Sequence, residues 1–143
     1  MTQANIVISG GRVIDPENQI DAILPVFISH GKIAAVGDKP DGFQVNQEII
    51  ADQSIVCPGF VDLCARFREP GDENKATIAS ESRAAVRSGI TTLCIPPDTT
   101  PVIDSPAMIE LIQESGVMVR LVPIGAFTKD LAGEELAEMG GLK

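Results

Sequence analysis

The feature that constrains this chain most is a change of rhythm at residue 58. Before it, short apolar runs are separated by turn signals such as Asp15-Pro16 and His30-Gly31, a pattern typical of strands joined by tight turns. After it, strand-like apolar runs alternate with helix-like segments. The sequence therefore predicts an α/β chain with an N-terminal antiparallel β module, residues 1–57, followed by an α/β part, residues 58–143.

The strands of the second part are almost entirely apolar, which favours a parallel sheet buried on both faces and joined by right-handed helical crossovers. We expect strands over residues 60–67, 91–95 and 117–122 and helices over 77–88, from Ser105 to Gly116 and over 134–139. Such units begin either a doubly wound sheet or a (β/α)₈ barrel. A nucleotide fold has no support, because no Gly-rich phosphate motif follows any strand. A complete barrel needs about 250 residues, so the second part is either an open fragment or the front of something longer.

Composition excludes several classes of partner. The formal charge of −9 and the pI near 4.4 disfavour nucleic acid and anionic membranes. No apolar run reaches membrane-spanning length and the first residues lack a signal pattern, so we expect a cytoplasmic protein.

Histidine and cysteine usage limits the chemistry further. The single histidine, His30, lies in a predicted hairpin turn, where we expect a positive φ rather than catalysis. Three cysteines without a CxxC pair argue against a disulfide framework and a structural zinc site, and we expect Cys57 and Cys94 to be buried, reduced thiols.

One predicted strand, PGFVDLCARFREPG at residues 58–71, has one unusually polar face. Because side chains alternate along a strand, Val61, Leu63, Ala65 and Phe67 fall on one face. The other face carries Asp62, Cys64, Arg66 and Arg68. A carboxylate, a thiol and two guanidiniums in a row predict a site at the end of this strand.

This stretch resembles the dihydroorotases of the amidohydrolase superfamily. The same resemblance extends over two later segments, ASESRAAVRSGITTLCIPPDTTPVID and LVPIGAFTKDLAGEELAEMGGLK. The segments ANIVISGGRVIDPENQID and IIADQSIVCPGFVD resemble the opening of the same family, a β-sandwich module that leads into the first strand of a (β/α)₈ barrel. The resemblance runs over essentially the whole chain and implies the first third of the family's architecture, with an incomplete barrel of three β/α units.

The resemblance also implies what each position does in active relatives. Their first barrel strand carries an Asp-x-His-x-His-x-Arg pattern whose histidines bind a catalytic zinc. This chain keeps Asp62 and Arg68 but has Cys64 and Arg66 at the histidine positions. The arginine equivalent to Arg68 and an asparagine at the position of Asp98 bind the substrate carboxylate in the family, so Arg68 and Asp98 form a vestigial substrate site. The remaining metal ligands come from later strands.

The chemistry of these side chains also argues against a metal site. Arg66 is a permanent cation without a lone pair to give a metal, so neither a metal site nor a catalytic residue is expected. Arg66 either replaces the charge of the metal by pairing with Asp62, Asp98 or another acid, or extends into solvent. At Asp98 a carboxylate faces the carboxylate of the substrate, and two such charges about 4 Å apart repel by about 4 kcal/mol at an effective dielectric of 20.

The leading functional hypothesis is therefore a non-catalytic dihydroorotase-like protein. The resemblance implies a structural role, because inactive homologues of the family accompany the catalytic subunit of aspartate carbamoyltransferase in bacteria and are needed for its assembly. The alternative is a fragment of a zinc-dependent cyclic amide hydrolase with an altered site, acting between dihydroorotate and N-carbamoyl-aspartate. A barrel interrupted after three units would leave apolar surfaces uncovered, which predicts a homo-oligomer.

Overall fold

The computed structural model describes residues 4–142. Contacts divide the chain into two compact units, Met1–Pro58 and Gly59–Lys143, each considered by itself below. Among the described residues, no helix has the length and apolar composition needed to cross a bilayer.

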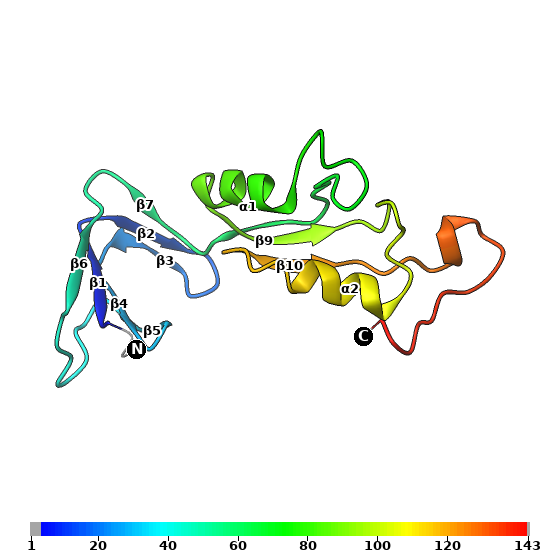
Figure 1. Cartoon of the computed structure of the whole chain (residues 1–143). Helices are drawn as coiled ribbons and strands as arrows, with labels where there is room; N and C mark the ends of the chain where they lie inside the picture. Colours follow the sequence, from blue (N-terminus) through cyan, green and yellow to red (C-terminus); the bar gives the residue numbers. More distant parts are fainter. Residues whose placement is uncertain (1–3, 143) are drawn as a thin grey trace. The chain divides into compact units, whose positions relative to one another are not determined.

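The first unit contains two small sheets (Figure 1). Its strands are β1 (Ile6–Ser9), β2 (Arg12–Asp15), β3 (Ile20–Ile23), β4 (Val26–Ser29), β5 (Lys32–Val36), β6 (Gln47–Ile50) and β7 (Ile55–Val56). One sheet has the order β5-β4-β1-β6 and the other β3-β2-β7. The prediction of a purely antiparallel module is wrong, because β6 pairs parallel with β1 and β7 pairs parallel with β2. The turn signals in the sequence predict only hairpins, in which neighbouring strands pair antiparallel. Strands β6 and β7 instead pair with β1 and β2, which lie far from them in the sequence.

Two turn predictions for this unit have different outcomes. His30 (φ 51°) and Gly31 (φ 73°) form the left-handed turn between β4 and β5, as predicted. A proline within an apolar run is typical of an edge strand or a bulge. Pro25 directly precedes β4, which is an inner strand with a register shift between Phe27 and Ile28, so the bulge and not the edge is observed. The missing amide of Pro25 costs no ladder bond there, and its carbonyl accepts from the Gly37 amide at 2.9 Å.

The core of the first unit is small. Val7, Phe27 and Phe43 form its buried cluster, and the two rings meet edge to face with centroids 5.3 Å apart. Cys57 is exposed, which contradicts the expectation of a buried thiol; it follows β7 in a segment that belongs to no strand or helix. Cys94, on the second unit, is half-buried.

The second unit is a three-stranded parallel sheet with helices in its crossovers (Figure 1). Its elements are β8 (Phe60–Asp62), α1 (Ile78–Arg87), β9 (Ile90–Ile95), α2 (Pro106–Gln113), β10 (Arg120–Pro123) and the short 3₁₀ helix η1 (Lys129–Leu131). The strand order is β10-β9-β8. The predicted parallel strands joined by helices are therefore present, although β8 is shorter than expected and β10 begins three residues later than expected.

Helix α1 begins and ends as the sequence indicates. The hydroxyl of Thr77 accepts from the Ser80 amide, and the Ser80 hydroxyl accepts from the Thr77 amide, which together form a capping box. Gly89, with φ 79°, follows the last turn. Within the helix, Ile78 and Ala85 are buried, whereas Val86 is exposed because it is turned by about 100° from Ala85.

One core joins these elements, and it contains Phe67, Ile78, Ala85, Leu93, Ile95, Ile103, Ile112 and Val119. The predicted helix over residues 134–139 is absent. Leu136 instead forms an antiparallel bridge with Thr128. Six residues between Gly133 and Gly140 are too few to nucleate a stable helix without strong packing.

Candidate functional site

The candidate site begins where β8 ends. The carboxylate Oδ1 of Asp62 accepts a hydrogen bond from the backbone amide of Cys64 at 2.9 Å. Such a side-chain bond two residues onward forms a local turn that competes with the sheet ladder. The predicted strand over residues 60–67 is therefore wrong beyond Asp62, and the chain continues as irregular backbone.

The alternation of faces fails at the same point. Leu63 is exposed although it was expected on the apolar face, whereas Phe67 is buried in the core. The segment nevertheless stays beside β9, because the Ala65 amide donates to the Cys94 carbonyl at 2.8 Å. The polar side chains of the site are thus presented by an irregular segment attached to β9.

Arg66 and Asp98 form the central contact of the site. Nε of Arg66 donates to Oδ2 of Asp98 at 2.7 Å, and Nη1 of Arg66 lies 3.8 Å from Sγ of Cys64. Asp98 belongs to the loop after β9, so the ion pair joins the chain segments that follow two neighbouring strands. Of the two alternatives for Arg66, pairing with an acid is observed, and Asp98 is that acid.

The pair is accessible to water, with side-chain exposures of 50% for Arg66 and 42% for Asp98. The hydrogen bond and the charge of Asp98 raise the pKa of Arg66 above its ordinary value, and the sulfur of Cys64 adds to the shift. Exposed pairs contribute little to folding stability. The consequence of this pair is therefore chemical: it gives the site a fixed cation that has no lone pair.

Two pockets adjoin this contact. A pocket of about 340 Å³ is lined by Asp62, Cys64, Arg66 and Phe67 on one side and by residues of α1 and β9 on the other. A narrow recess of about 10 Å³ lies between Arg66, Arg68 and Asp98. Small-molecule sites usually have volumes of about 300–1,000 Å³, so the recess that holds Arg68 and Asp98 together is too small for a substrate.

Arg68 is not part of the ion pair. It has a left-handed backbone (φ 67°), and its carbonyl accepts from the Asp72 amide at 2.6 Å. Asp98 bonds to Arg66 and not to Arg68. The structure thus brings Cys64, Arg66 and Asp98 into direct contact, and places Asp62 and Arg68 at the margins.

A zinc ion does not fit the residues present. Within residues 4–142, no three histidine, cysteine, aspartate and glutamate side chains are grouped so that they could hold a metal ion. The pocket beside Arg66 is lined by three possible donors, Asp62, Cys64 and Glu81, and the Arg66 guanidinium contacts Cys64 and pairs with Asp98. Zinc needs three or four converging donors, and a permanent cation beside them opposes a dication.

Sequence reasoning missed two residues near the site. Oε2 of Glu69 accepts from the Ile78 amide at 2.5 Å, which satisfies a free amide in the first turn of α1. Ser82 is buried on α1 and its hydroxyl has no partner among the described residues. The position of Glu69, nine residues before the helix, carries no local signal for capping, and Ser82 resembles an ordinary exposed helix residue in sequence.

A family model described as "Dihydro-orotase-like" matches residues 53–143, which is more than half of the chain. The chain belongs to the dihydro-orotase-like family. The parallel sheet, the irregular segment after β8 and the Arg66–Asp98 pair are therefore features of a dihydro-orotase-like chain.

Curated relatives of this dihydro-orotase-like chain cover it almost completely. It is 45% identical over 141 residues to a "Dihydroorotase-like protein" of Pseudomonas putida, covering 96% of this chain and 33% of that protein. It is 46% identical over 142 residues to a "Dihydroorotase" of Solibacter usitatus, with the same coverage. The chain thus spans about a third of the length of the curated relatives it matches.

Solved structures show the same fold at low sequence identity. The L-hydantoinase of Arthrobacter aurescens superimposes with a TM-score of 0.74 at 21% identity, over 88% of this chain and 28% of that chain. A dihydroorotase structure superimposes with a TM-score of 0.57 at 19% identity, over 90% of this chain and 31% of that chain. Because these identities are low, the superpositions establish the fold and nothing more.

Proposed function

We propose that this chain is part of a non-catalytic dihydroorotase-like protein that supports the assembly of aspartate carbamoyltransferase through its catalytic subunit. The observation that carries the proposal is the Arg66–Asp98 ion pair, in which a guanidinium occupies a position where active relatives have a zinc-binding histidine. In this proposal the mouth of the barrel keeps its charge balance and shape while losing hydrolysis.

We also propose that the second unit forms the first three strand–helix units of a (β/α)₈ barrel and that the first unit is part of its β-sandwich. The superposition on the L-hydantoinase supports this arrangement, since it covers 88% of the chain. In a barrel of this kind, catalytic residues lie at the carboxyl ends of the strands. Asp62 and Arg66 follow β8, and Asp98 follows β9, which are the positions that such a site would use.

The loss of hydrolysis follows from two separate features. Active zinc hydrolases lower the pKa of a bound water toward neutrality, and the donor set beside Arg66 does not support that ion. The substrate carboxylate would also meet Asp98 instead of a neutral amide, and Asp98 already uses Oδ2 to accept from Arg66. The name "Dihydroorotase-like protein" of the Pseudomonas relatives, distinct from "Dihydroorotase", is consistent with this proposal.

Co-elution tests the proposed role. The chain is mixed at micromolar concentration with the aspartate carbamoyltransferase catalytic subunit of its source organism and separated by size-exclusion chromatography. We expect a joint peak that neither protein gives alone. Separate elution would contradict the assembly role.

Zinc analysis tests the disabled site independently. We expect less than stoichiometric zinc and no ring opening of dihydroorotate above background for the natural chain. The double variant Cys64→His/Arg66→His should bind zinc more tightly, whereas the matched control Cys57→His/Arg120→His should not, because neither of its histidines stands at a zinc-ligand position of the family. Stoichiometric zinc together with turnover in the natural chain would refute the non-catalytic role.

A further inference from the structure

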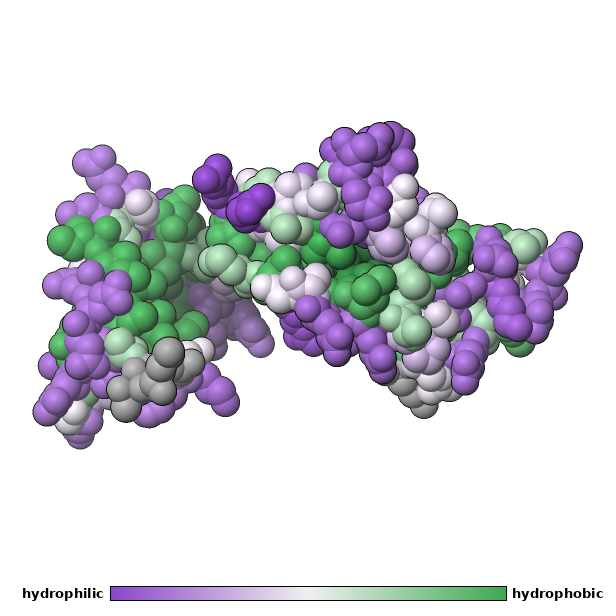
Figure 2. All heavy atoms as spheres, viewed as in Figure 1, coloured by the Kyte–Doolittle hydropathy of each residue, from purple (hydrophilic) through white to green (hydrophobic). Residues whose placement is uncertain are grey.

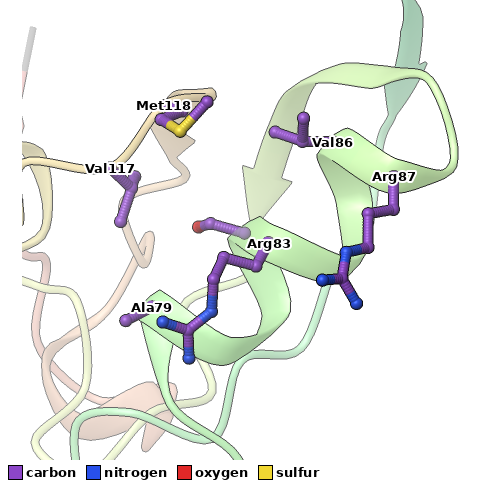
Figure 3. A pocket seen from close by; sticks show the side chains of 7 residues that line it. Ala79, Arg83, Val86, Arg87, Val117 and Met118 are labelled. Atoms are coloured by element: carbon purple, nitrogen blue, oxygen red, sulfur yellow. The ribbon is translucent and has the colours of Figure 1, made fainter.

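A second pocket, called here the α1 pocket, lies on another flank of α1 and shares no residue with the pocket beside Arg66. Its volume is about 310 Å³. Its walls are Ala79 and Val86 of α1 and Val117 and Met118 of the loop before β10. Figure 3 shows Val86 and Met118 on opposite sides of the opening.

The apolar wall of the α1 pocket is open to water. The side chain of Met118 is 85% exposed and that of Val86 is 40% exposed. Methionine on an open surface is typical of binding sites, because its flexible side chain adapts to the shape of a partner. An exposed apolar hollow of this kind indicates a surface that is covered in an assembly.

Ser82 provides a second, independent observation. It lines the α1 pocket, is only 3% exposed, and its hydroxyl has no hydrogen-bond partner among residues 4–142. Buried polar groups in folded proteins are almost always paired. A polar group that enters the pocket from outside would satisfy this hydroxyl.

Two arginines define the charge of the α1 pocket. Arg83 and Arg87 lie one turn apart on α1, both are exposed, and Figure 3 shows both side chains beside the pocket. In the part of the chain that the structure describes, neither forms an ion pair. Two unpaired cations in a chain of net charge −9 favour a ligand that carries carboxylates.

The chain itself contains a segment of complementary character, residues 134–139, called here the acidic segment. Leu136 and Met139 are exposed, as are Glu134 and Glu138. Neither of these two glutamates forms an ion pair within the described residues. Apolar side chains flanked by carboxylates match an apolar pocket flanked by guanidiniums.

The acidic segment is held in place on its own unit. Leu136 forms a bridge with Thr128, the Ala137 amide donates to the Phe127 carbonyl at 3.1 Å, and Glu135 pairs with Lys129. These contacts hold it to residues that follow β10 in the chain, whereas Val117 and Met118 precede β10. Because the two surfaces adjoin opposite ends of one strand, the segment cannot enter the α1 pocket of its own chain.

We propose that the α1 pocket binds the acidic segment of a second copy of this chain. Leu136 and Met139 cover Val86 and Met118, while Glu134 and Glu138 pair with Arg83 and Arg87. Such contacts join two different surfaces, so they either occur twice about a two-fold axis in a closed dimer or run head-to-tail into a ring or an open chain. The proposal is independent of aspartate carbamoyltransferase and goes beyond the proposed function.

Charge reversal tests this contact. Variant A carries Arg83→Glu/Arg87→Glu, and variant B carries Glu134→Arg/Glu138→Arg; both are compared with the natural chain by sedimentation velocity. We expect the natural chain to associate and each variant alone to have a dissociation constant raised at least about tenfold. An equimolar mixture of A and B should associate again, because each variant then offers the charge that the other needs.

Controls separate this contact from general charge effects and misfolding. Lys32→Glu/Lys39→Glu changes the net charge as much as variant A does, but alters exposed lysines of the first unit, and should associate like the natural chain. Met118→Ser alters an exposed side chain that the fold does not need, and should weaken association about threefold. A monomeric natural chain, a mixture of A and B that stays dissociated, or an unchanged Met118→Ser would overturn the proposal.

Discussion

The two units of this chain use their isoleucines differently. In the second unit, Ile78, Ile95, Ile103 and Ile112 are buried in one core. In the first unit no described isoleucine is buried, and several lie largely exposed on the strands. Figure 2 shows hydrophobic residues, in green, at the surface of both units. Helices cover the sheet in the second unit, whereas the buried cluster of the first has three residues and lies against only one of its two sheets.

The comparison teaches that apolar periodicity and burial are separate properties. A sheet buries an apolar face only when a second layer covers it, and the first unit contains apolar strands without enough covering layer of its own. Its exposed isoleucines form apolar surface that its own strands do not cover. The second unit has the larger core, but it too leaves apolar side chains exposed, including Phe60, Val61 and Met118.

A pair of isoleucine truncations gives the most direct test of this difference in burial between the two units. Ile112→Ala removes a side chain with 0% exposure and should lower the free energy of unfolding of the second unit by about 2–5 kcal/mol. Ile50→Ala alters a residue that is 71% exposed and should cost less than about 0.5 kcal/mol. Urea denaturation followed by hydrogen exchange assigns each loss to its unit. A large cost for Ile50→Ala would show that the first unit is covered in solution.

Ser82 offers a sharper test within the second unit. Ser82→Ala removes a buried hydroxyl that has no partner among the described residues, so it should raise the free energy of unfolding by about 1–3 kcal/mol. Ser80→Ala is the matched control, because Ser80 belongs to the capping box and its loss should destabilise α1. Thermal unfolding at low protein concentration measures both. Destabilisation by Ser82→Ala would mean that its hydroxyl is already paired.

The two helix caps of the second unit should contribute different amounts to stability, with a smaller difference than in the tests above. Thr77→Ala removes a hydroxyl that accepts from the Ser80 amide at 3.1 Å, and should cost about 1 kcal/mol. Ser105 occupies the same position before α2 but its side chain makes no capping bond, so Ser105→Ala should cost only a few tenths of a kcal/mol. Chemical denaturation distinguishes these values. Equal costs would contradict the assigned difference between the caps.

The smallest expected effect is a loss of stability at low pH. Hydrogen bonds from Arg12 and Lys75 lower the pKa of Asp21 in the first unit and of Asp72 in the second below the ordinary value of 3.8. Because the folded pKa lies below the unfolded one, each pair stabilises its unit above that ordinary value and loses its contribution as pH falls through the folded pKa. Carboxyl NMR titration should show both midpoints depressed, and salt should reduce the shifts. Asp21→Asn should reduce the acid sensitivity of the β2–β3 hairpin but not remove it, because the hydrogen bond from Asn18 also lowers the pKa of Asp15.

Features set by neighbouring residues could be predicted from the sequence. Thr77 and Gly89 delimit α1 as expected, and His30-Gly31 forms the expected turn, because caps and tight turns depend on a few adjacent residues. The parallel pairing of β1 with β6 could not be predicted, since it depends on strands about forty residues apart. Because consecutive strands usually pair with each other in antiparallel hairpins, the sequence favours a purely antiparallel first unit, which is not the one observed.

The candidate site was likewise predictable only in part. Residue types and resemblance identified Cys64, Arg66 and Asp98, and the structure brings these three side chains together. The strand was predicted to continue to Phe67, but the bond from the Cys64 amide to Asp62 ends it early. Periodicity describes which side chains alternate but contains no information about a carboxylate that competes for a backbone amide.

The bond between Arg66 and Asp98 also has an evolutionary consequence. A chain that replaced only Arg66 with histidine would leave the Asp98 carboxylate without its cation, and one that replaced only Asp98 would release the guanidinium. Each single substitution thus meets a charge imbalance before it gains any new contact. We therefore expect the residues at these two positions to change together in related chains.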